Sequence, residues 1–440
     1  MWTIAPLPSC SGSPPRQTAQ SRIWPRPPLL KRRSMPIGKI PGMADGTKIE
    51  WTDATVNAIN GCSVVSPGCT NCYAMRLAGT RMKNHPTRLG LTINSKAGPV
   101  WNGEVRLVEQ ALLQPLRWQK PRMIFWNAHG DMFHPAVSDD WIDRCFAVMA
   151  MTPQHTHQVL TKRADRMREY LNDRGIVRRI CEAAYNIHRA RPCFDDGPEF
   201  SRGNSRRFNA KMKEWWEHIG ALTAWTVRGG CAAVQFDRQE PGADYPSRLA
   251  WPLPNVWLGV SIEDQQRADE RIPHLIFTPA AVRWLSIEPM LGPIDLTSIR
   301  APRESDEPDL DTDWRFDALE VGDYYWFDAN GYSEGGDGPY RDNRIDWIVV
   351  GGESGPGARP MQVQWARSLR DQCANATCHG EDAAVPFFFK QWGDYLPCDQ
   401  MQADGKIWTN GSNSALRAHK SFTGRYLDGV KHDGVPIASD

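Results

Sequence analysis

Short apolar runs, each ending in a polar or glycine-containing turn, recur along the chain after residue 43. Such runs are typical of strands that are buried on both faces of a parallel sheet. Six occur, at residues 122–127, 157–161, 256–261, 282–287, 346–350 and 385–389. Helical patterns lie between several of them, at residues 141–151, 164–172, 265–271 and 363–373. This alternation predicts an α/β fold with a partial (β/α) barrel over residues 43–400, and an open doubly wound sheet is the alternative.

Two stretches interrupt this pattern and are expected to be loop insertions on the barrel, at about residues 174–250 and 301–343. Residues 162–213 contain fourteen Lys/Arg and seven Asp/Glu, whereas residues 301–343 contain thirteen Asp/Glu and three Arg. A solvated surface is the simplest interpretation of either charge run. Residues 401–440 are expected to form a C-terminal extension.

Residues 1–42 have the composition of a disordered arm, with nine prolines, seven Lys/Arg and no acidic residue. Translation from a start upstream of Met43 and a nucleic-acid-binding tail are the alternatives. The 440-residue chain has a formal net charge of +1. That balance excludes a uniformly basic nucleic-acid coat protein, so any such binding would need a local patch.

The eleven cysteines are odd in number and mostly isolated, which is not the pattern of a secreted disulfide framework. A reducing cytoplasm is therefore the expected location. The sequence contains no apolar run of about 18 residues, so we expect no transmembrane helix and no membrane partner.

One group of cysteines is different, because Cys62, Cys69 and Cys72 follow a C-x6-C-x2-C spacing around a Pro67-Gly68 turn. The turn allows the three thiolates to converge as ligands of a soft metal. Three cysteines without a fourth ligand leave one coordination position open, as a catalytic [4Fe–4S] cluster requires. A closed zinc site would need a fourth ligand such as His85, His129 or His134, and unliganded cysteines are a third possibility.

Polar residues follow nearly every apolar run, at the edge of the sheet where barrel enzymes carry their active sites. Asp131, Glu288 and Lys390 are the catalytic candidates, as acid/base or orienting groups. Lys162 and Arg163 could hold an anionic group. The cofactor-binding candidates are Asn127, Ser261, Glu263, Ser286, Gly351, Gly352 and Glu353. Helix capping or an exposed ion pair is the alternative for each single residue.

Several segments resemble a known family, among them GCSVVSPGCTNCYA, WLGVSIED, WLSIEPMLGPI, WIVVGGESGPGARP and FFFKQWG. Over roughly residues 43–395 the sequence resembles the phage gene-product thirty-seven / gene-product sixty-eight family, a domain of unknown function. It is also similar to radical-SAM enzymes in placing a three-cysteine loop ahead of a partial barrel. It departs from their common pattern in the six residues between Cys62 and Cys69 and in the late position of Gly351-Gly352-Glu353.

This resemblance implies a [4Fe–4S] cluster, S-adenosylmethionine, an electron donor and, for a phage-encoded protein, the host-cell cytoplasm. The predicted activity is reductive SAM cleavage acting on a nucleic-acid base, which would have to be unstacked or single-stranded. The phage resemblance and the basic residues favour nucleic acid as the partner. A radical enzyme acting on a peptide or small molecule, favoured by the acidic insertion, is one alternative. A zinc-stapled nucleic-acid-binding protein without catalysis is the other.

Overall fold

The computed structural model describes residues 47, 49–189, 249–301, 313–321, 325–327, 333–335, 343–378, 381–407 and 415–436. The predicted disordered arm at residues 1–42 lies outside the described residues. So do most of the first predicted insertion and much of the second.

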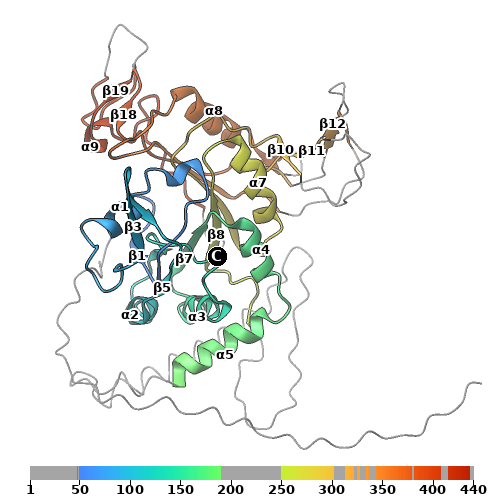
Figure 1. Ribbon diagram of the computed structural model, residues 1–440. Helices are drawn as coiled ribbons and strands as arrows, with labels where there is room; N and C mark the ends of the chain where they lie inside the picture. The colour runs from blue at the N-terminus through green and yellow to red at the C-terminus, as the bar shows by residue number, and fades with distance from the viewer. Residues whose placement is uncertain are drawn as a thin grey trace, which may run out of the picture. The chain divides into compact units, whose positions relative to one another are not determined.

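The centre of the fold is one sheet of seven parallel strands that curls into a half-barrel (Figure 1). The strands are β1 (Ala54–Val56), β6 (Met123–Trp126), β7 (Thr156–Thr161), β8 (Val256–Ser261), β9 (Val282–Ile287), β14 (Trp347–Gly351) and β17 (Phe387–Gln391). Their order in the sheet is their order along the chain. A doubly wound sheet would reverse direction at a switch point, so the partial barrel is confirmed and the open-sheet alternative is wrong. The sequence pattern located six of the seven strands and missed the three-residue β1, which is too short to show a period.

Four helices follow strands and pack beside the sheet (Figure 1), and they are α3 (Asp139–Ala150), α4 (Ala164–Leu171), α7 (Gln265–Ile276) and α8 (Val363–Ala374). A fifth, α5 (Ile176–Arg189), follows α4 and packs against α3. The Asp264 carboxylate caps α7 by accepting the Arg267 N–H at 3.0 Å. The first predicted insertion, at about residues 174–250, begins with the helix α5, which packs against α3. Its apolar residues recur at helical spacing, with Ile176, Ile180 and Ala184 buried, so this signal was present in the sequence.

Side chains alternate along the strands between two apolar clusters. The larger cluster contains Leu258, Val260, Leu285 and Ile287 together with the apolar faces of the helices. A second cluster is aromatic and forms the floor inside the half-barrel. Its buried members are Trp51, Phe125, Trp257, Trp284, Trp347, Val349 and Phe388.

The aromatic floor continues toward the carboxyl ends of the strands in steps of two residues. On β9, Trp284 is followed on the same face by Ser286 and then by Glu288, just past the strand. On β8, Trp257 is followed by Gly259, Ser261 and Glu263. A period of two therefore places aromatic rings at the bottom of the half-barrel, small residues above them and charged residues at its mouth.

Short elements decorate this core. Near the N-terminus they are β2 (Ile59–Asn60), η1 (Pro67–Cys69), α1 (Tyr73–Gly79), β3 (Thr92–Ser95), β4 (Gly98–Trp101), β5 (Arg106–Leu107), α2 (Glu109–Leu112) and η2 (Pro115–Arg117). Four strands form a small antiparallel sheet. β10 (Ile299–Arg300) lies just before the second predicted insertion, and β11 (Asp313–Phe316), β12 (Tyr325–Phe327) and β13 (Ser333–Gly335) lie within it. Toward the C-terminus follow β15 (Thr377–Cys378), β16 (Glu381–Asp382), β18 (Tyr395–Leu396), β19 (Leu416–Arg417) and α9 (Lys420–Thr423).

The C-terminal segment, residues 415–436, packs against the free edge of the half-barrel. Asp433 bridges to Phe388 of β17, and the Trp347 indole N–H donates to the Gly434 carbonyl at 2.7 Å. The Asp428 carboxylate pairs with Arg367 and Arg370 of α8. The segment thus covers an edge that would otherwise present unpaired backbone groups. Among the described residues, no helix is both long and apolar enough to cross a membrane.

Candidate functional site

The cysteine loop, defined here as residues 62–72, lies across the carboxyl ends of the barrel strands. It connects β2 to α1 and contains the short helix η1. Polar side chains from the ends of β6, β7, β8 and β14 hold it from both sides. The three cysteines are therefore placed at the mouth of the half-barrel.

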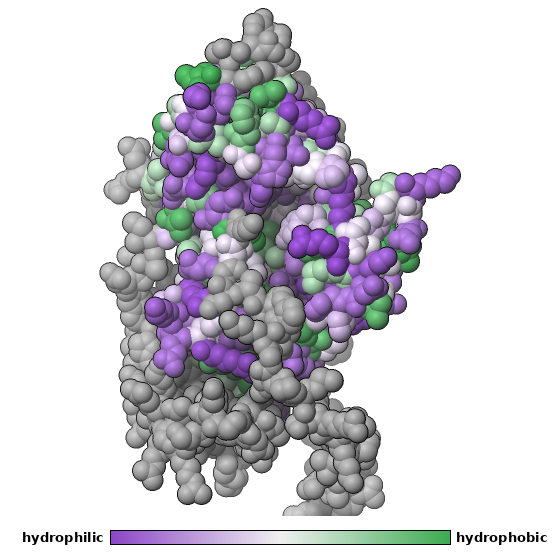
Figure 2. Space-filling view, turned by 90° about the vertical axis from the view of Figure 1, so that its left-hand side faces the viewer, coloured by the Kyte–Doolittle hydropathy of each residue, from purple (hydrophilic) through white to green (hydrophobic). Residues whose placement is uncertain are grey.

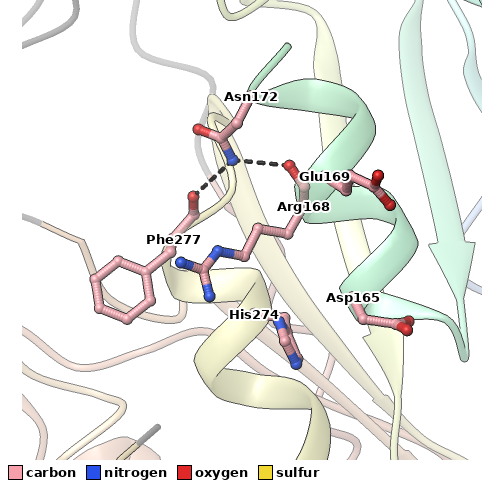
Figure 3. A pocket seen from close by; sticks show the side chains of 6 residues that line it. All are labelled: Asp165, Arg168, Glu169, Asn172, His274 and Phe277. Carbon is pink, nitrogen blue, oxygen red and sulfur yellow. Dashed lines mark hydrogen bonds between the residues drawn. The ribbon is translucent and has the colours of Figure 1, made fainter. Parts of the chain in front are cut away.

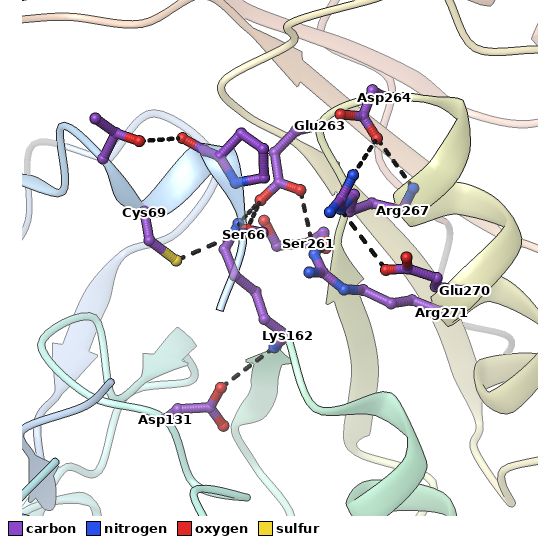
Figure 4. A network of polar contacts seen from close by, with 12 residues as sticks. Ser66, Cys69, Asp131, Lys162, Ser261, Glu263, Asp264, Arg267, Glu270 and Arg271 are labelled. Atoms are coloured by element: carbon purple, nitrogen blue, oxygen red, sulfur yellow. Dashed lines mark hydrogen bonds and ion pairs between the residues drawn. The ribbon is translucent and has the colours of Figure 1, made fainter. Parts of the chain in front are cut away.

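The first anchorage joins the loop to the ends of β7 and β8 (Figure 4). Glu263 is fully buried and accepts a hydrogen bond from the Ser66 hydroxyl at 2.7 Å. Its carboxylate also pairs with Lys162 and, at 3.3 Å, with Arg271 of α7. A Cβ atom on Gly68 would lie 2.4 Å from Glu263 Oε1, so only glycine lets the turn approach this carboxylate so closely.

Asp131 extends this anchorage to the first cysteine. Its carboxylate accepts hydrogen bonds from the Phe133 and Lys162 backbone N–H groups, from Thr161 at 2.7 Å and from Arg163 at 2.7 Å. The Arg163 guanidinium in turn donates to Ser63 at 2.7 Å and approaches the Cys62 sulfur at 3.6 Å. Asp131 was predicted to be a catalytic acid/base or orienting group, and these contacts place its carboxylate against Arg163.

The second anchorage lies at the end of β14. The Glu353 carboxylate accepts two side-chain hydrogen bonds from Arg359, at 2.8 and 2.7 Å, and one from the Asn71 amide at 3.1 Å. The same amide group donates to the Gly357 carbonyl at 2.8 Å, and Arg359 donates to the Pro67 carbonyl at 3.1 Å. Glu353 therefore holds the residue next to Cys72 in place.

Electrostatics distinguish the three thiols. Burial raises the pKa of Cys62 to about 12, with the Asp131 carboxylate adding to the effect, and burial also raises the pKa of Cys72. Burial likewise opposes ionisation of Cys69, but the neighbouring Lys162 ammonium and hydrogen bonds outweigh it and lower the pKa of that thiol. Burial lowers the pKa of Lys162 to about 8. Cys69 is therefore the thiol that ionises first.

A second group of charges lies at the opposite side of the mouth, after β9 and on β17. Lys390 Nζ pairs with the Glu288 carboxylate at 2.7 and 3.0 Å, and the Gln391 amide donates to the same carboxylate at 3.0 Å. Burial is the main cause that raises the pKa of the Tyr73 phenol, followed by the charges of Cys72 and Glu288. By surface area the Tyr73 side chain is 57% exposed, so part of its ring is open to solvent.

Two buried polar groups near the mouth have no partner among the described residues, the Asn127 side-chain Nδ2 and the Ser354 hydroxyl. Asn127 adopts a left-handed backbone conformation with φ +58° and accepts the Ile59 N–H at 2.9 Å through Oδ1. An unpaired buried donor is costly, and a polar ligand could satisfy it.

The glycines before Glu353 serve packing within the protein. A Cβ atom on Gly352 would lie 2.0 Å from the Trp392 carbonyl oxygen, and one on Gly351 would lie 3.3 Å from the Glu288 carboxylate. At Gly352 the close backbone approach is therefore to Trp392, and the cofactor role predicted for the two glycines stays a prediction.

The donors at the mouth fit an iron–sulfur cluster in chemistry. Three thiols share one loop, cationic side chains lie beside two of them, and orphaned donors lie near the mouth. Within the described ranges, no three Cys, His, Asp or Glu side chains are gathered closely enough to form a ready-made metal site. The sulfurs would therefore have to rotate toward one another when a metal binds.

The three histidines considered as a fourth zinc ligand differ in their hydrogen bonds. His134 Nε2 hydrogen-bonds Ser63 at 3.0 Å, and its Nδ1 accepts the Ala136 N–H, so both of its ring nitrogens are engaged. His129 Nδ1 bonds Arg88 at 2.5 Å, and His85 Nδ1 bonds Thr87 at 2.8 Å, through one ring nitrogen each.

The structure thus brings most of the predicted residues to one mouth, and it adds several that the sequence did not single out. Ser261 and Ser286 are buried on the inner face, directly paired across β8 and β9. The additions are Ser66, Asn71, Tyr73, Arg271 and Arg359. Asn71 and Tyr73 flank Cys72, so proximity to the motif was the one signal available for them.

A separate open pocket lies on the outer helical layer between α4 and α7 (Figure 3). Its lining residues are Asp165, Arg168, Glu169, Asn172, His274 and Phe277. The Asn172 amide closes one side by donating to the Arg168 and Phe277 carbonyls. None of the cysteine-loop anchors lines this pocket.

Comparison with known proteins places the chain in a family. A family model described as "Protein of unknown function (DUF5131)" matches residues 46–436. The chain belongs to this family. No curated protein and no solved structure matches the chain. The matched residues include the half-barrel, the cysteine loop and the C-terminal segment. The family description mentions neither a phage product nor radical-SAM chemistry.

Proposed function

We propose that this DUF5131 protein is an iron–sulfur enzyme of the radical-SAM type that acts on a nucleic-acid base. The cysteine loop across the mouth of a parallel half-barrel carries the proposal. Cys62, Cys69 and Cys72 would hold a [4Fe–4S] cluster through three irons, and the position without a protein ligand would receive S-adenosylmethionine. When bound, such a cluster would supply one electron from a donor protein to break the sulfonium C5′–S bond. Hydrogen from the substrate would complete 5′-deoxyadenosine.

The chain's own residues would orient these groups and tune their charge. Lys162 and Arg163 lie beside the Cys69 and Cys62 sulfurs and compensate negative charge there. Hydrogen bonds and charges near the sulfurs are among the factors that set the potential of such centres. The unpaired Asn127 amide and Ser354 hydroxyl are the donors proposed to meet the polar groups of the cofactor.

Glu288 and Lys390 are the acid/base pair proposed for the substrate side. They come from β9 and β17, have no hydrogen bond to the cysteine loop, and keep side-chain exposures of 21% and 13%. A carboxylate and an ammonium at 2.7 Å can accept and donate a proton without a large charge separation. The aromatic floor below them would exclude water from the reacting atoms.

A nucleic-acid base is proposed over a peptide because the segment that follows the cysteine loop is basic. Residues 73–122 contain nine Lys/Arg and two Glu. A base acted on inside this mouth would have to be single-stranded or flipped.

The test is anaerobic purification followed by iron and sulfide analysis, then incubation with S-adenosylmethionine and a strong reductant. We expect about four iron and four sulfide per chain, as a [4Fe–4S] cluster requires, and release of 5′-deoxyadenosine. Cys69→Ala should lose both, whereas Cys398→Ala, a partly exposed cysteine outside the loop, should lose neither.

Two outcomes would contradict the proposal. A colourless protein with one zinc per chain would indicate a structural metal site. A protein that contains the cluster but releases no 5′-deoxyadenosine would contradict the proposed cleavage of S-adenosylmethionine and leave the cluster assignment standing.

A further inference from the structure

The segment that follows the cysteine loop is the most basic described part of the chain. Residues 73–122 contain nine Lys/Arg and two Glu. One of the two acids, Glu109, pairs with Arg144 of α3, which leaves Glu104 as the only other negative side chain of the segment. This basic run lies almost entirely within the described residues, unlike the longer one at residues 162–213.

The arginines of this segment are of two kinds. Arg76, Arg88 and Arg106 bond inward, to the Asn71 side chain, to His129 and to the Pro86 and Leu89 carbonyls, respectively. These bonds order the loop between α1 and β3. Their guanidinium groups serve structure, and we assign them no ligand.

Three further cations of the segment point outward. Arg81, Lys83 and Lys96 are exposed and make no ion pair in the part of the chain that the structure describes. A Cβ atom on Gly79, which ends α1, would lie 2.0 Å from Pro99 of β4. The loop with Arg81 and Lys83 therefore starts beside the hairpin whose turn carries Lys96.

Apolar and aromatic side chains are exposed on the same surface. Ile93 and Leu89 are more than half exposed, and Tyr73 lies between this surface and the mouth, with its hydroxyl donating to the Ala128 carbonyl at 2.9 Å. Figure 2 views this side of the molecule and shows hydrophilic side chains interspersed with apolar ones. Cations without an ion pair beside an exposed aromatic ring are a combination that binds single-stranded nucleic acid through phosphates and bases, and Tyr73 supplies the ring here.

We propose that Arg81, Lys83 and Lys96 bind the phosphate backbone of a single-stranded nucleic acid, and that Tyr73 stacks on a base at the entrance to the half-barrel. The basic surface is continuous with the cysteine loop, because α1 starts at the residue after Cys72 and packs against β3 and β4. A strand held there would lead a base toward Glu288 and Lys390. The inference deepens the proposed function by placing its substrate, and it rests on that function only for what happens to the base.

The test is a binding measurement on the full-length protein with labelled single-stranded DNA, duplex DNA and RNA of mixed sequence. Fluorescence anisotropy is followed as salt rises from about 50 to about 200 mM, since phosphate contacts weaken steeply over that range. We expect the single strand to bind more tightly than the duplex. Replacing Arg81, Lys83 and Lys96 together by alanine should lower the slope of log K against log salt by about 2, at about 0.7 per contact.

A matched variant controls for net charge. Arg174, Arg178 and Arg300 are also exposed and belong to α5, the turn before it and β10, so their replacement by alanine removes the same charge elsewhere. This variant should keep the wild-type slope. Tyr73→Leu should weaken single-strand binding about tenfold, with Tyr73→Phe retaining it, since stacking needs only the ring.

Three results would overturn the inference. One is absence of salt-dependent binding at the lowest salt, and another is an equal loss in the two triple variants. The third is competition by polyglutamate as effective as that by the oligonucleotide, which would identify an acidic protein partner. Failure of the proposed function gives a different result. Strand binding without release of 5′-deoxyadenosine would contradict the proposed enzyme activity and support the nucleic-acid-binding surface. Release of 5′-deoxyadenosine without strand binding would contradict the surface and support the activity.

Discussion

The two sides of the half-barrel mouth use their charged residues differently. On the β7–β8 side, Lys162, Arg163 and Glu263 are bonded to the cysteine loop or beside its sulfurs. On the β9–β17 side, Glu288 pairs with Lys390 and accepts a hydrogen bond from Gln391, and neither Glu288 nor Lys390 bonds to the loop. Both sets follow strands at the same edge of one sheet, so the sequence presents them as equivalent.

The difference separates residues that build the site from residues that can act in it. A carboxylate whose acceptor positions are filled by the protein, as those of Asp131 are, can position a neighbour but has little capacity left for a ligand. Glu288 and Lys390 keep some exposure and lie opposite Tyr73. We therefore expect substitutions on the first side to change stability and substitutions on the second to change turnover.

The largest expected effect is the loss of stability in Glu263→Gln. The substitution keeps the shape but leaves Lys162 and Arg271 without their buried counter-charge, which should cost about 3 kcal/mol of unfolding free energy. Urea unfolding of metal-free protein measures it. Glu270→Gln on α7 is the control, because its carboxylate is 48% exposed and lies 3.6 Å from Arg267, so it should cost less than about 0.5 kcal/mol. Equal losses of unfolding free energy in the two variants would contradict the assignment of the β7–β8 side to stability.

A smaller effect, mainly on turnover, is expected for Lys390→Met. Release of 5′-deoxyadenosine should fall about a hundredfold, as for loss of a general acid or base, while iron content stays near the wild-type value. The melting temperature should fall less than in Glu263→Gln, because the Glu288 carboxylate left without its partner is partly exposed. Lys406→Met, which removes an exposed lysine on the C-terminal side, should change none of the three. A parallel loss of iron would show that Lys390 supports the cysteine loop after all.

The smallest effect concerns the second anchorage and depends on pH. Burial alone would raise the pKa of Glu353, but hydrogen bonds from Arg359 and Asn71 outweigh it and lower the pKa. A carboxyl group with a lowered pKa in the folded state stabilises the protein above its unfolded pKa of about 4.3, and this stabilisation is lost as the pH falls through the folded value. Glu353→Gln should therefore lower the free energy of unfolding by about 1 kcal/mol at pH 7, and by progressively less below about pH 4. The expected loss is small because Arg359 is one-third exposed and solvent screens the pair.

Thermal or urea unfolding of wild type and Glu353→Gln across pH 3 to pH 8 is the measurement. A difference that grows toward acid would reverse the sign and exclude this account of Glu353. Arg359→Lys should behave like a weaker version of the same change, because an ammonium cannot form the bidentate contact.

The sequence by itself determined the features that depend on neighbours along the chain. Six strands and their polar ends followed from continuous apolar runs, and the helices at α3, α4, α7 and α8 followed from the helical period of 3.6 residues. The same reasoning could have found α5, whose apolar residues have helical spacing. The three cysteines and their turn were also visible, because ligand spacing within a loop is local.

Only the tertiary structure decided which charges pair. Glu263 meets Ser66 from 197 residues away, and Glu353 meets Asn71 from 282 residues away, because the curl of the sheet brings the end of β14 back toward the loop that follows β2. No local period encodes such contacts, since they depend on strand order, on the register of each pair and on the path of the connecting loop. The sequence could therefore predict a polar mouth. Which side of the mouth holds the cysteine loop and which side stays free of it depends on the tertiary contacts.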